Sequence, residues 1–374
     1  MLERINFCSC TKIPKPALNN LISHCTGLTK LELAKTNISN DTLSCIAVYC
    51  KELRFLDISQ TPISDKGLLC LTLAQDLTEV DNERFGQCRK IVVLKLTGCE
   101  KITEKAVATT INQLPKLRVL EYHNSIPAIV LAMRQKSNYT HSFVSLQSSD
   151  ELLEETDLCE VLLSSSKSLE SVHLTTFMEM SDATAFSMLE LQRLKKFFLV
   201  NEFGSHSVRF SNIFSPVVEK FGPQLTELEL SQISDVSINR LRDFCVNLET
   251  LSLLWNTDYV RDDFNEPLMP YFKSLKSVKI FSAEIDPVGM GSEESNIPHN
   301  DLLSVIQSPE LEDIQLLNCH NLFAETIQHA LVYSKFIKLK NFKLERCNRI
   351  TYDGLRYGQS GHRFSLFALK IVGS

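Results

Sequence analysis

The stretch IVVLKLTGCEKITEKAV, residues 91–107, contains the pattern that decides the fold of this chain. Ile91, Leu94 and Leu96 put apolar side chains at its first, fourth and sixth positions, and the polar Lys95 separates the last two, as in a short half-buried strand. Thr103 is a residue type that caps helices, and apolar residues at helical spacing follow it. The stretch therefore predicts a strand, a turn and a capped helix, in that order.

The same strand pattern recurs along the whole chain of 374 residues. Its copies are LERINF from Leu2, LTKLEL from Leu28, LRFLDI from Leu53, IVVLKL from Ile91, LRVLEY from Leu117, a degenerate HSFVSL from His141, LESVHL from Leu169, LKKFFL from Leu194, LTELEL from Leu225, LETLSL from Leu248, LKSVKI from Leu275, LEDIQL from Leu311, LKNFKL from Leu339 and LFALKI from Leu366. Ten of the thirteen gaps between successive starts lie between 23 and 28 residues, which is the period of leucine-rich repeats. We therefore predict one α/β domain over residues 1–374, a leucine-rich-repeat solenoid (horseshoe) of about 14 repeats. Its parallel strands are expected on the concave face and its helices on the convex face.

Three gaps exceed this period and predict insertions at about 75–90, 201–216 and 282–300. Insertions in a solenoid usually form loops on one face. Loops on a rigid scaffold are favoured recognition sites, although tolerated decoration is an equally good interpretation of the third insertion.

Composition and charge restrict the class of partner. The formal net charge is −6 and the pI is near 5.9, which argues against general nucleic-acid binding. The first residues do not resemble a secretory signal, and the longest apolar stretch, 126–133, is far short of a membrane span. We expect no membrane partner and a cytoplasmic or nuclear location.

The twelve cysteines are best explained by the repeat. Eight of them occupy two fixed positions of the repeat, one before the strand and one after it: Cys25, Cys50, Cys88, Cys245, Cys10, Cys99, Cys319 and Cys347. This register favours structural thiols over metal ligands or redox groups.

Signatures of catalysis are missing from the sequence. It contains no glycine-rich phosphate loop, no paired-histidine zinc helix and no nucleophile elbow. We therefore predict no enzyme activity, no catalytic residue, no metal site and no cofactor.

The repeats resemble those of a known family. Two cysteines in a unit of about 26 residues are typical of the cysteine-containing leucine-rich repeat, and the chain resembles the repeat region of F-box/leucine-rich-repeat proteins. The matching stretches are LKLTGCEKITEKAV from Leu94, FKLERCNRITYDGL from Phe342 and ISDKGL from Ile63. The resemblance implies capture of a protein substrate for ubiquitination by a cullin-based ligase of the SCF type, with a Skp adaptor and a cullin as partners.

One feature departs from that family. No F-box is visible upstream, because the first strand pattern begins at Leu2. Either an N-terminal part with the F-box and a cap is missing, or the protein is a free-standing repeat protein similar to F-box-less relatives.

The variable positions beside the middle apolar residue of each strand are expected to point into the concave face. The candidate protein-binding residues there are Phe55, Val119, Phe143, Lys196, Phe198, Glu227, Glu229, Leu254, Trp255, Lys279 and Phe281. Phe198, Trp255 and Phe281 are the preferred anchors, because exposed aromatic residues carry most interface energy. The alternatives are that the aromatic residues belong to the core and that the charged residues form an ordinary solvated face.

The sequence thus favours a protein-recognition scaffold, most specifically the substrate-binding part of an SCF-type ubiquitin-ligase receptor. The alternative is a scaffold or an inhibitor of a target protein that acts without an F-box. Both would use the same curved surface, so the sequence does not separate them.

Overall fold

The structure is a computed structural model of residues 1–374, and it describes residues 2–72, 88–136, 141–149, 153–176, 179–202, 208–260, 271–282, 297–347, 349–350 and the backbone of 369–372. The chain divides into two compact units. The N-terminal unit comprises residues 1–174 and 190–192, and the C-terminal unit comprises residues 175–189 and 193–374. The prediction that the chain forms a single domain stays a prediction.

The N-terminal unit alternates short strands with helices. Its strands are β1 (Arg4–Asn6), β2 (Lys30–Glu32), β3 (Phe55–Asp57), β4 (Val93–Lys95), β5 (Val119–Glu121), β6 (Ser145–Ser148) and β7 (Ser171–Thr176), whose last two residues belong to the C-terminal unit. Its helices are α1 (Lys15–His24), α2 (Asn40–Tyr49), α3 (Asp65–Cys70), α4 (Glu104–Gln113), α5 (Ser125–Gln135) and α6 (Glu155–Ser164).

The C-terminal unit has longer strands. They are β8 (Lys196–Asn201), β9 (Glu227–Ser231), β10 (Thr250–Leu254), β11 (Ser277–Phe281), β12 (Asp313–Leu317), β13 (Asn341–Glu345) and β14 (Leu369–Val372). The helices are α7 (Asp182–Leu189), α8 (Ser215–Phe221), α9 (Ile238–Phe244), α10 (His299–Ile306) and α11 (Ala324–Ser334), with a π-helical turn at Phe210–Phe214 and a 3₁₀ turn at Gly222–Gln224.

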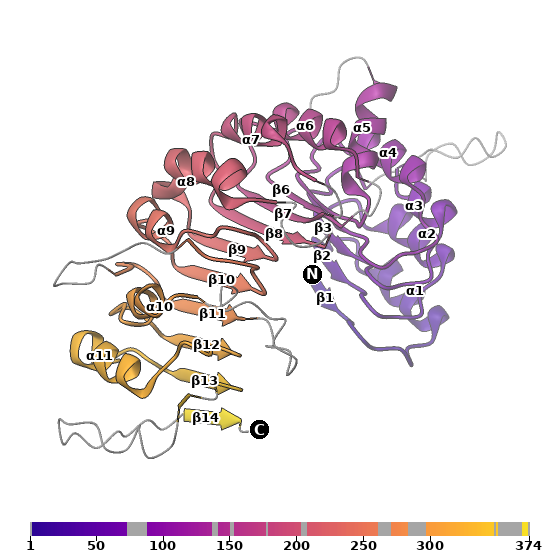
Figure 1. The fold of residues 1–374 in the computed structure, drawn as a ribbon. Helices are drawn as coiled ribbons and strands as arrows, with labels where there is room; N and C mark the ends of the chain where they lie inside the picture. The colour runs from indigo at the N-terminus through magenta and orange to yellow at the C-terminus, as the bar shows by residue number, and fades with distance from the viewer. Residues whose placement is uncertain are drawn as a thin grey trace, which may run out of the picture. The chain divides into compact units, whose positions relative to one another are not determined.

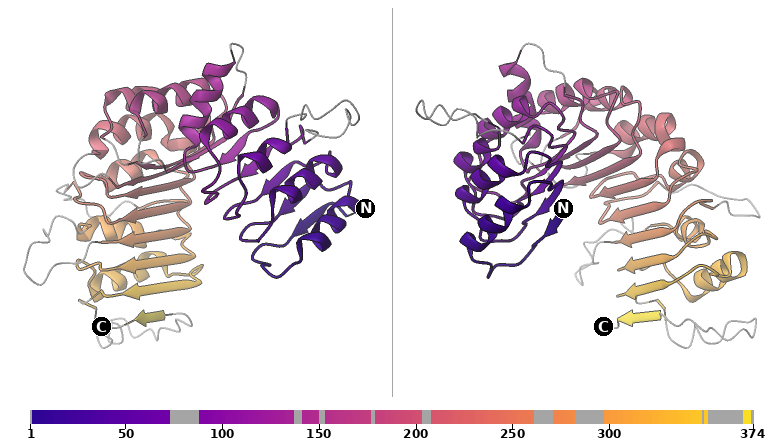
Figure 2. Two further views of the ribbon diagram at one scale, coloured as in Figure 1. Left: turned by 90° about the vertical axis from the view of Figure 1, so that its right-hand side faces the viewer. Right: turned by 180° about the vertical axis from the view of Figure 1, so that it is seen from behind.

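Within each unit the strands pair in parallel and in chain order, and the helices lie together on one side of them (Figure 1, Figure 2). The middle apolar residue of one strand is the partner of the middle apolar residue of the next. Leu228 of β9, for example, pairs with Phe197 of β8 and with Leu251 of β10, and all three are buried. The leucine-rich-repeat solenoid predicted from the period is confirmed.

The degenerate sixth repeat is the exception, because its register differs from the one predicted. Leu146, and not Val144, pairs with Leu120 of β5 and with Val172 of β7. Phe143 then takes the first apolar position of the repeat and is completely buried, with 0% of its surface exposed. Its assignment to the concave face is therefore wrong. The residues of β6 that stand in its place are Ser145 and Gln147, both half-buried.

A left-handed residue ends the strand in most repeats. It lies four positions after the middle apolar residue and has a φ between 51° and 71° at Lys35, Gln60, Gly98, Gln232, Trp255, Asn318 and Arg346. This conformation turns the chain away from the sheet and favours glycine or asparagine. At Gly98 a side chain would also collide with the Cγ atom of Gln60, 2.9 Å from the position of a Cβ atom.

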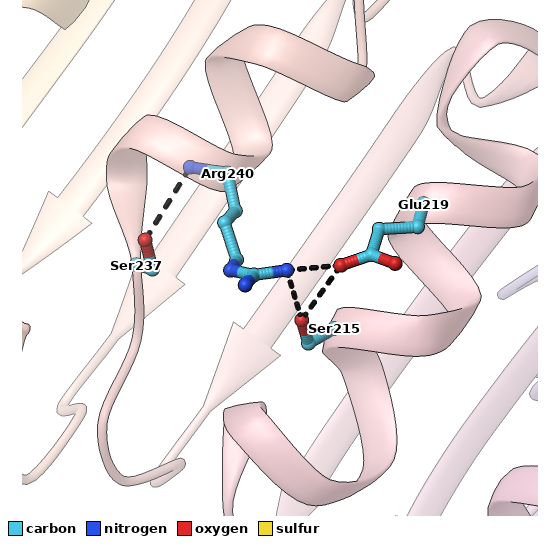
Figure 3. Close-up of polar contacts among 4 residues, drawn as sticks. All are labelled: Ser215, Glu219, Ser237 and Arg240. Atoms are coloured by element: carbon cyan, nitrogen blue, oxygen red, sulfur yellow. Dashed lines mark hydrogen bonds and ion pairs between the residues drawn. The ribbon is translucent and has the colours of Figure 1, made fainter.

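Several helices begin after capping residues, and polar contacts join neighbouring helices. Ser39, Ser64 and Thr103 precede α2, α3 and α4, as their residue types predict. Before α9 the cap is Ser237, whose Oγ accepts the N–H of Arg240 at 3.3 Å. The Arg240 side chain then reaches back to α8, where it donates to the Ser215 Oγ at 2.8 Å and pairs with Glu219 (Figure 3).

The buried thiols act as small hydrogen-bonding core residues. All twelve cysteines are free. The Cys99 Sγ lies 3.1 Å from the carbonyl oxygen of Ile58. Thr61, which occupies the equivalent position of the preceding repeat, donates from its Oγ1 to the same oxygen at 2.6 Å. Burial raises the pKa of Cys50, Cys88 and Cys245 to about 12, so these thiols are uncharged near neutral pH.

Alternating charges mark the residue just before the first strand residue in four consecutive repeats of the C-terminal unit. The residues are Glu249, Lys276, Glu312 and Lys340. The Lys276 Nζ lies 2.7 Å from Glu249, and the Lys340 Nζ lies 2.5 Å from Glu312. Hydrogen bonding to Glu249 raises the pKa of Lys276, and hydrogen bonding from Lys340 lowers the pKa of Glu312.

The predicted insertions fall largely outside the described residues. Of the insertion at 201–216, the described residues 208–216 form the π-helical turn and the start of α8, and Phe210 and Phe214 are buried there. This part contributes to the core. No helix in the described part of the chain is long and apolar enough to cross a membrane.

Candidate protein-interaction surface

The candidate surface is the side of the sheet opposite the helices, which we call the open face. Because successive residues of a strand point to opposite sides, three positions per strand in the C-terminal unit reach this face. The third positions of five neighbouring strands, Val200, Ser231, Leu254, Phe281 and Leu317, are register partners and form a mostly apolar row. Trp255 follows Leu254 at the end of this row.

Trp255 and Phe281 form an aromatic pair. Their ring centroids are 5.8 Å apart at an interplanar angle of 64°, an edge-on arrangement. Trp255 is 45% exposed, and Phe281 and Leu254 are half-buried. The alternative that Trp255 belongs to the core does not fit this exposure. A large rigid ring that stays open to solvent on a sheet face is the type of residue that anchors protein interfaces.

The backbone of Trp255 is unusual for its residue type. Its φ of 51° places it in the left-handed region, where a bulky side chain is disfavoured. The equivalent positions of other repeats carry Gln60, Gly98, Gln232 and Asn318. A backbone outlier of this kind costs free energy and persists where surrounding structure or function holds it. The tryptophan therefore stands at a position where folding alone favours a smaller residue.

Charged residues occupy several of the first and second positions of the same strands. Lys196 and Glu227 form an ion pair with 2.5 Å between Nζ and Oε1. Glu229 and Lys279 lie two strands apart in the second row, separated by Ser252, which is their register partner on either side. Within the described residues neither Glu229 nor Lys279 forms an ion pair.

The remaining aromatic candidate of that unit lies one strand away from Glu229. Phe198 is the register partner of Glu229 and is half-buried. The C-terminal unit thus brings together eight of the eleven predicted residues: Lys196, Phe198, Glu227, Glu229, Leu254, Trp255, Lys279 and Phe281.

Phe55 and Val119 belong to the open face of the N-terminal unit. Together with Val93 they form a short apolar row on β3, β4 and β5. The ammonium groups of Lys30 and Lys95 lie 4.6 and 5.8 Å from the centroid of the Phe55 ring. Both lysines also form ion pairs, so the Phe55 ring is already engaged by neighbours within its own sheet.

Sequence reasoning assigned Phe143 to the binding surface, where the structure instead places Gln147. The spacing held the signal for the correct register. A repeat that starts at Phe143 is 26 residues from both Leu117 and Leu169, whereas the start chosen at His141 gives gaps of 24 and 28. Leu317, which extends the apolar row beyond Phe281, follows from the register once the neighbouring strands are paired.

The described residues contain no cluster of three or more histidine, cysteine, aspartate or glutamate side chains placed to hold a metal ion. Stacked repeats of this kind offer an extended surface for binding.

Solved structures are similar to this chain in fold. A structure of the Rad7–Elc1 complex in yeast matches with a TM-score of 0.54 and 16% identity, over 91% of this chain and 73% of that one. An internalin, InlF, from Listeria monocytogenes matches with a TM-score of 0.43 and 17% identity, over 85% of this chain and 74% of that one. No protein-family model and no curated protein sequence matches the chain.

Proposed function

We propose that this chain is a protein-recognition scaffold that binds a protein substrate on the open face of its C-terminal unit and presents it to a ubiquitin ligase of the SCF type. The observation that carries the proposal is Trp255, an exposed aromatic residue in a left-handed backbone position beside Phe281. Aromatic anchors of this kind dominate the energy of protein interfaces.

Two observations support the ligase part of the proposal. The repeats of residues 94–107 and 342–355 resemble those of F-box/leucine-rich-repeat receptors. In addition, Rad7, to which the chain is similar in fold, was solved in complex with a second protein, Elc1. By analogy we expect a Skp adaptor and a cullin as partners of the protein that contains this chain, in the cytoplasm or the nucleus.

The test is purification of the tagged protein from cytoplasmic and nuclear extracts, with any upstream coding sequence included, followed by quantitative mass spectrometry. Stoichiometric recovery of a Skp adaptor and a cullin would support the ligase role. Recovery of one other protein at that level, with neither of them, would overturn it and favour the F-box-independent scaffold or inhibitor.

The variant Trp255→Asn is the matched control in the same experiment. Because Trp255 lies on the proposed substrate surface, this variant should retain the ligase subunits and lose the substrate. Loss of every partner at once would indicate misfolding, which the melting temperature of the purified variant would reveal.

A further inference from the structure

Most of the charged side chains that the structure describes on the open face of the C-terminal unit are engaged by neighbouring side chains. Lys196 pairs with Glu227, and Lys343 pairs with Glu345 at 2.7 Å. The Asp313 carboxylate accepts the Gln315 amide at 3.0 Å. Glu229 and Lys279 are half-buried like these residues, but neither has an ionic or hydrogen-bonding side-chain partner among the described residues.

These two opposite charges are too far apart to pair with each other. Glu229 pairs in register with Ser252, and Ser252 pairs with Lys279, so two strand spacings separate them. At about 4.8 Å per spacing the separation of the two backbones is about 10 Å. Ser252 lies between them, only 3% exposed. A half-buried charge without a partner keeps only part of its hydration, and a ligand of opposite charge would compensate for the part that is lost.

The aromatic pair lies directly beside these charges. Phe281 is two residues after Lys279 on β11, so both side chains point to the open face. Leu254 stands in the same relation to Ser252 on β10, and Trp255 follows it. One compact surface, made of Glu229, Lys279, Phe281 and Trp255, therefore presents an acidic group, a basic group and an apolar platform.

We infer that this surface binds an extended peptide segment of the partner that carries one basic and one acidic side chain two or three residues apart, next to a large apolar side chain. The basic side chain pairs with Glu229, the acidic side chain pairs with Lys279, and the apolar side chain packs on Trp255 and Phe281. Two or three residues of extended chain span about 7–10 Å, which matches the separation of the two charges once side-chain reach is included. This inference rests on the proposed function as far as it assigns a protein partner, and it does not depend on a ubiquitin ligase.

The mixed charge of this surface decides against other ligand classes. A nucleic acid requires several cationic groups that face its phosphates, whereas here the carboxylates of Glu227 and Glu229 lie on the same face of β9 and Lys279 lies two strands away. A peptide supplies both signs of charge at the required spacing.

The experiment is selection of a random peptide display library against the full chain, with the variant Trp255→Asn used for counter-selection. We expect the enriched peptides to share one basic and one acidic residue two or three positions apart and an adjacent large apolar residue. The same selection is repeated on the double variant Glu229→Lys/Lys279→Glu. There the order of the two charges relative to the apolar residue should reverse, because the swap exchanges their positions on the sheet.

The matched control is the double variant Lys343→Glu/Glu345→Lys, which lies on β13, outside the candidate residues. This swap changes charges on the same face but preserves an existing ion pair, so the enriched peptides should remain those of the unmodified chain. Enriched peptides without the two charges, the same charge order on the swapped surface, or no enrichment that depends on Trp255 would each overturn the inference.

Affinity provides the second readout. A fluorescein-labelled consensus peptide should bind the Glu229→Lys variant at least about tenfold more weakly than the unmodified chain, by fluorescence anisotropy, and the loss should shrink at high salt. Equal affinities would contradict the assignment of Glu229. These peptide measurements involve no ligase subunit, so they distinguish a failure of this inference from a failure of the ligase role.

Discussion

The indole ring of Trp255 packs edge-on against the ring of Phe281, and the backbone N–H of Trp255 donates to the carbonyl oxygen of Phe281 at 2.6 Å. Main chain and side chain thus join the ends of β10 and β11 at the same point. An anchor that is held in this way loses little conformational freedom on binding, which increases the affinity obtained from its contact area.

Replacement of Trp255 by asparagine should separate binding from folding. Asparagine tolerates the left-handed conformation and is the natural residue at the equivalent position 318. Relief of strain offsets the lost ring contact, so the free energy of unfolding should change by less than about 1 kcal/mol. Partner affinity should fall by tenfold or more. Urea unfolding and a binding titration measure the two quantities, and a large loss of stability would show that the indole belongs to the core.

Leu228→Ala tests the register of the C-terminal unit. Leu228 is buried between Phe197 and Leu251, so its truncation should destabilise the fold by roughly 2–5 kcal/mol. The neighbouring Glu229→Ala is the control, because a half-buried residue that faces away from the helices should change stability by about 0.5 kcal/mol or less. Comparable effects at both positions, in chemical denaturation, would mean that the strand faces are assigned incorrectly.

The sixth repeat can be tested in the same manner. Phe143 is buried and Gln147 lies on the open face, so Phe143→Ala should cost about 3–5 kcal/mol and Gln147→Ala about 0.5 kcal/mol or less. The reverse result would restore the register in which Val144 is the central residue.

The buried thiols should make the protein sensitive to alkaline pH. The pKa of Cys88 is raised to about 12 by burial, from an ordinary value near 9. Its contribution to stability is therefore fully present below about pH 9 and is lost as the pH rises towards 12, because the unfolded chain ionises first. Cys88→Ala should lower the free energy of unfolding at pH 8 and also flatten its decline between pH 9 and 11. An unchanged slope in urea melts across this range would contradict the role of the thiol.

The sequence was sufficient for the fold because two periods, of two residues in the strands and about 26 residues in the repeat, repeat often enough to be recognised. It failed at His141, where polar and apolar residues within one degenerate copy fit two registers and only pairing with both neighbours distinguishes them. Most candidate surface residues followed from the alternation of each strand. The left-handed backbone of Trp255 could not be predicted in this way, because that conformation favours small residues and tryptophan is an exception.

The alternating charges of Glu249, Lys276, Glu312 and Lys340 restrict how this part of the gene can change. Loss of a single repeat between Glu249 and Glu312 would bring two carboxylates to neighbouring strands, where like charges repel. Loss of two consecutive repeats would bring Glu249 next to Lys340 and keep the attraction. Repeats in this region are therefore best deleted or duplicated two at a time. Exposed residues of little individual energetic value thus favour an even number of repeats in any such change.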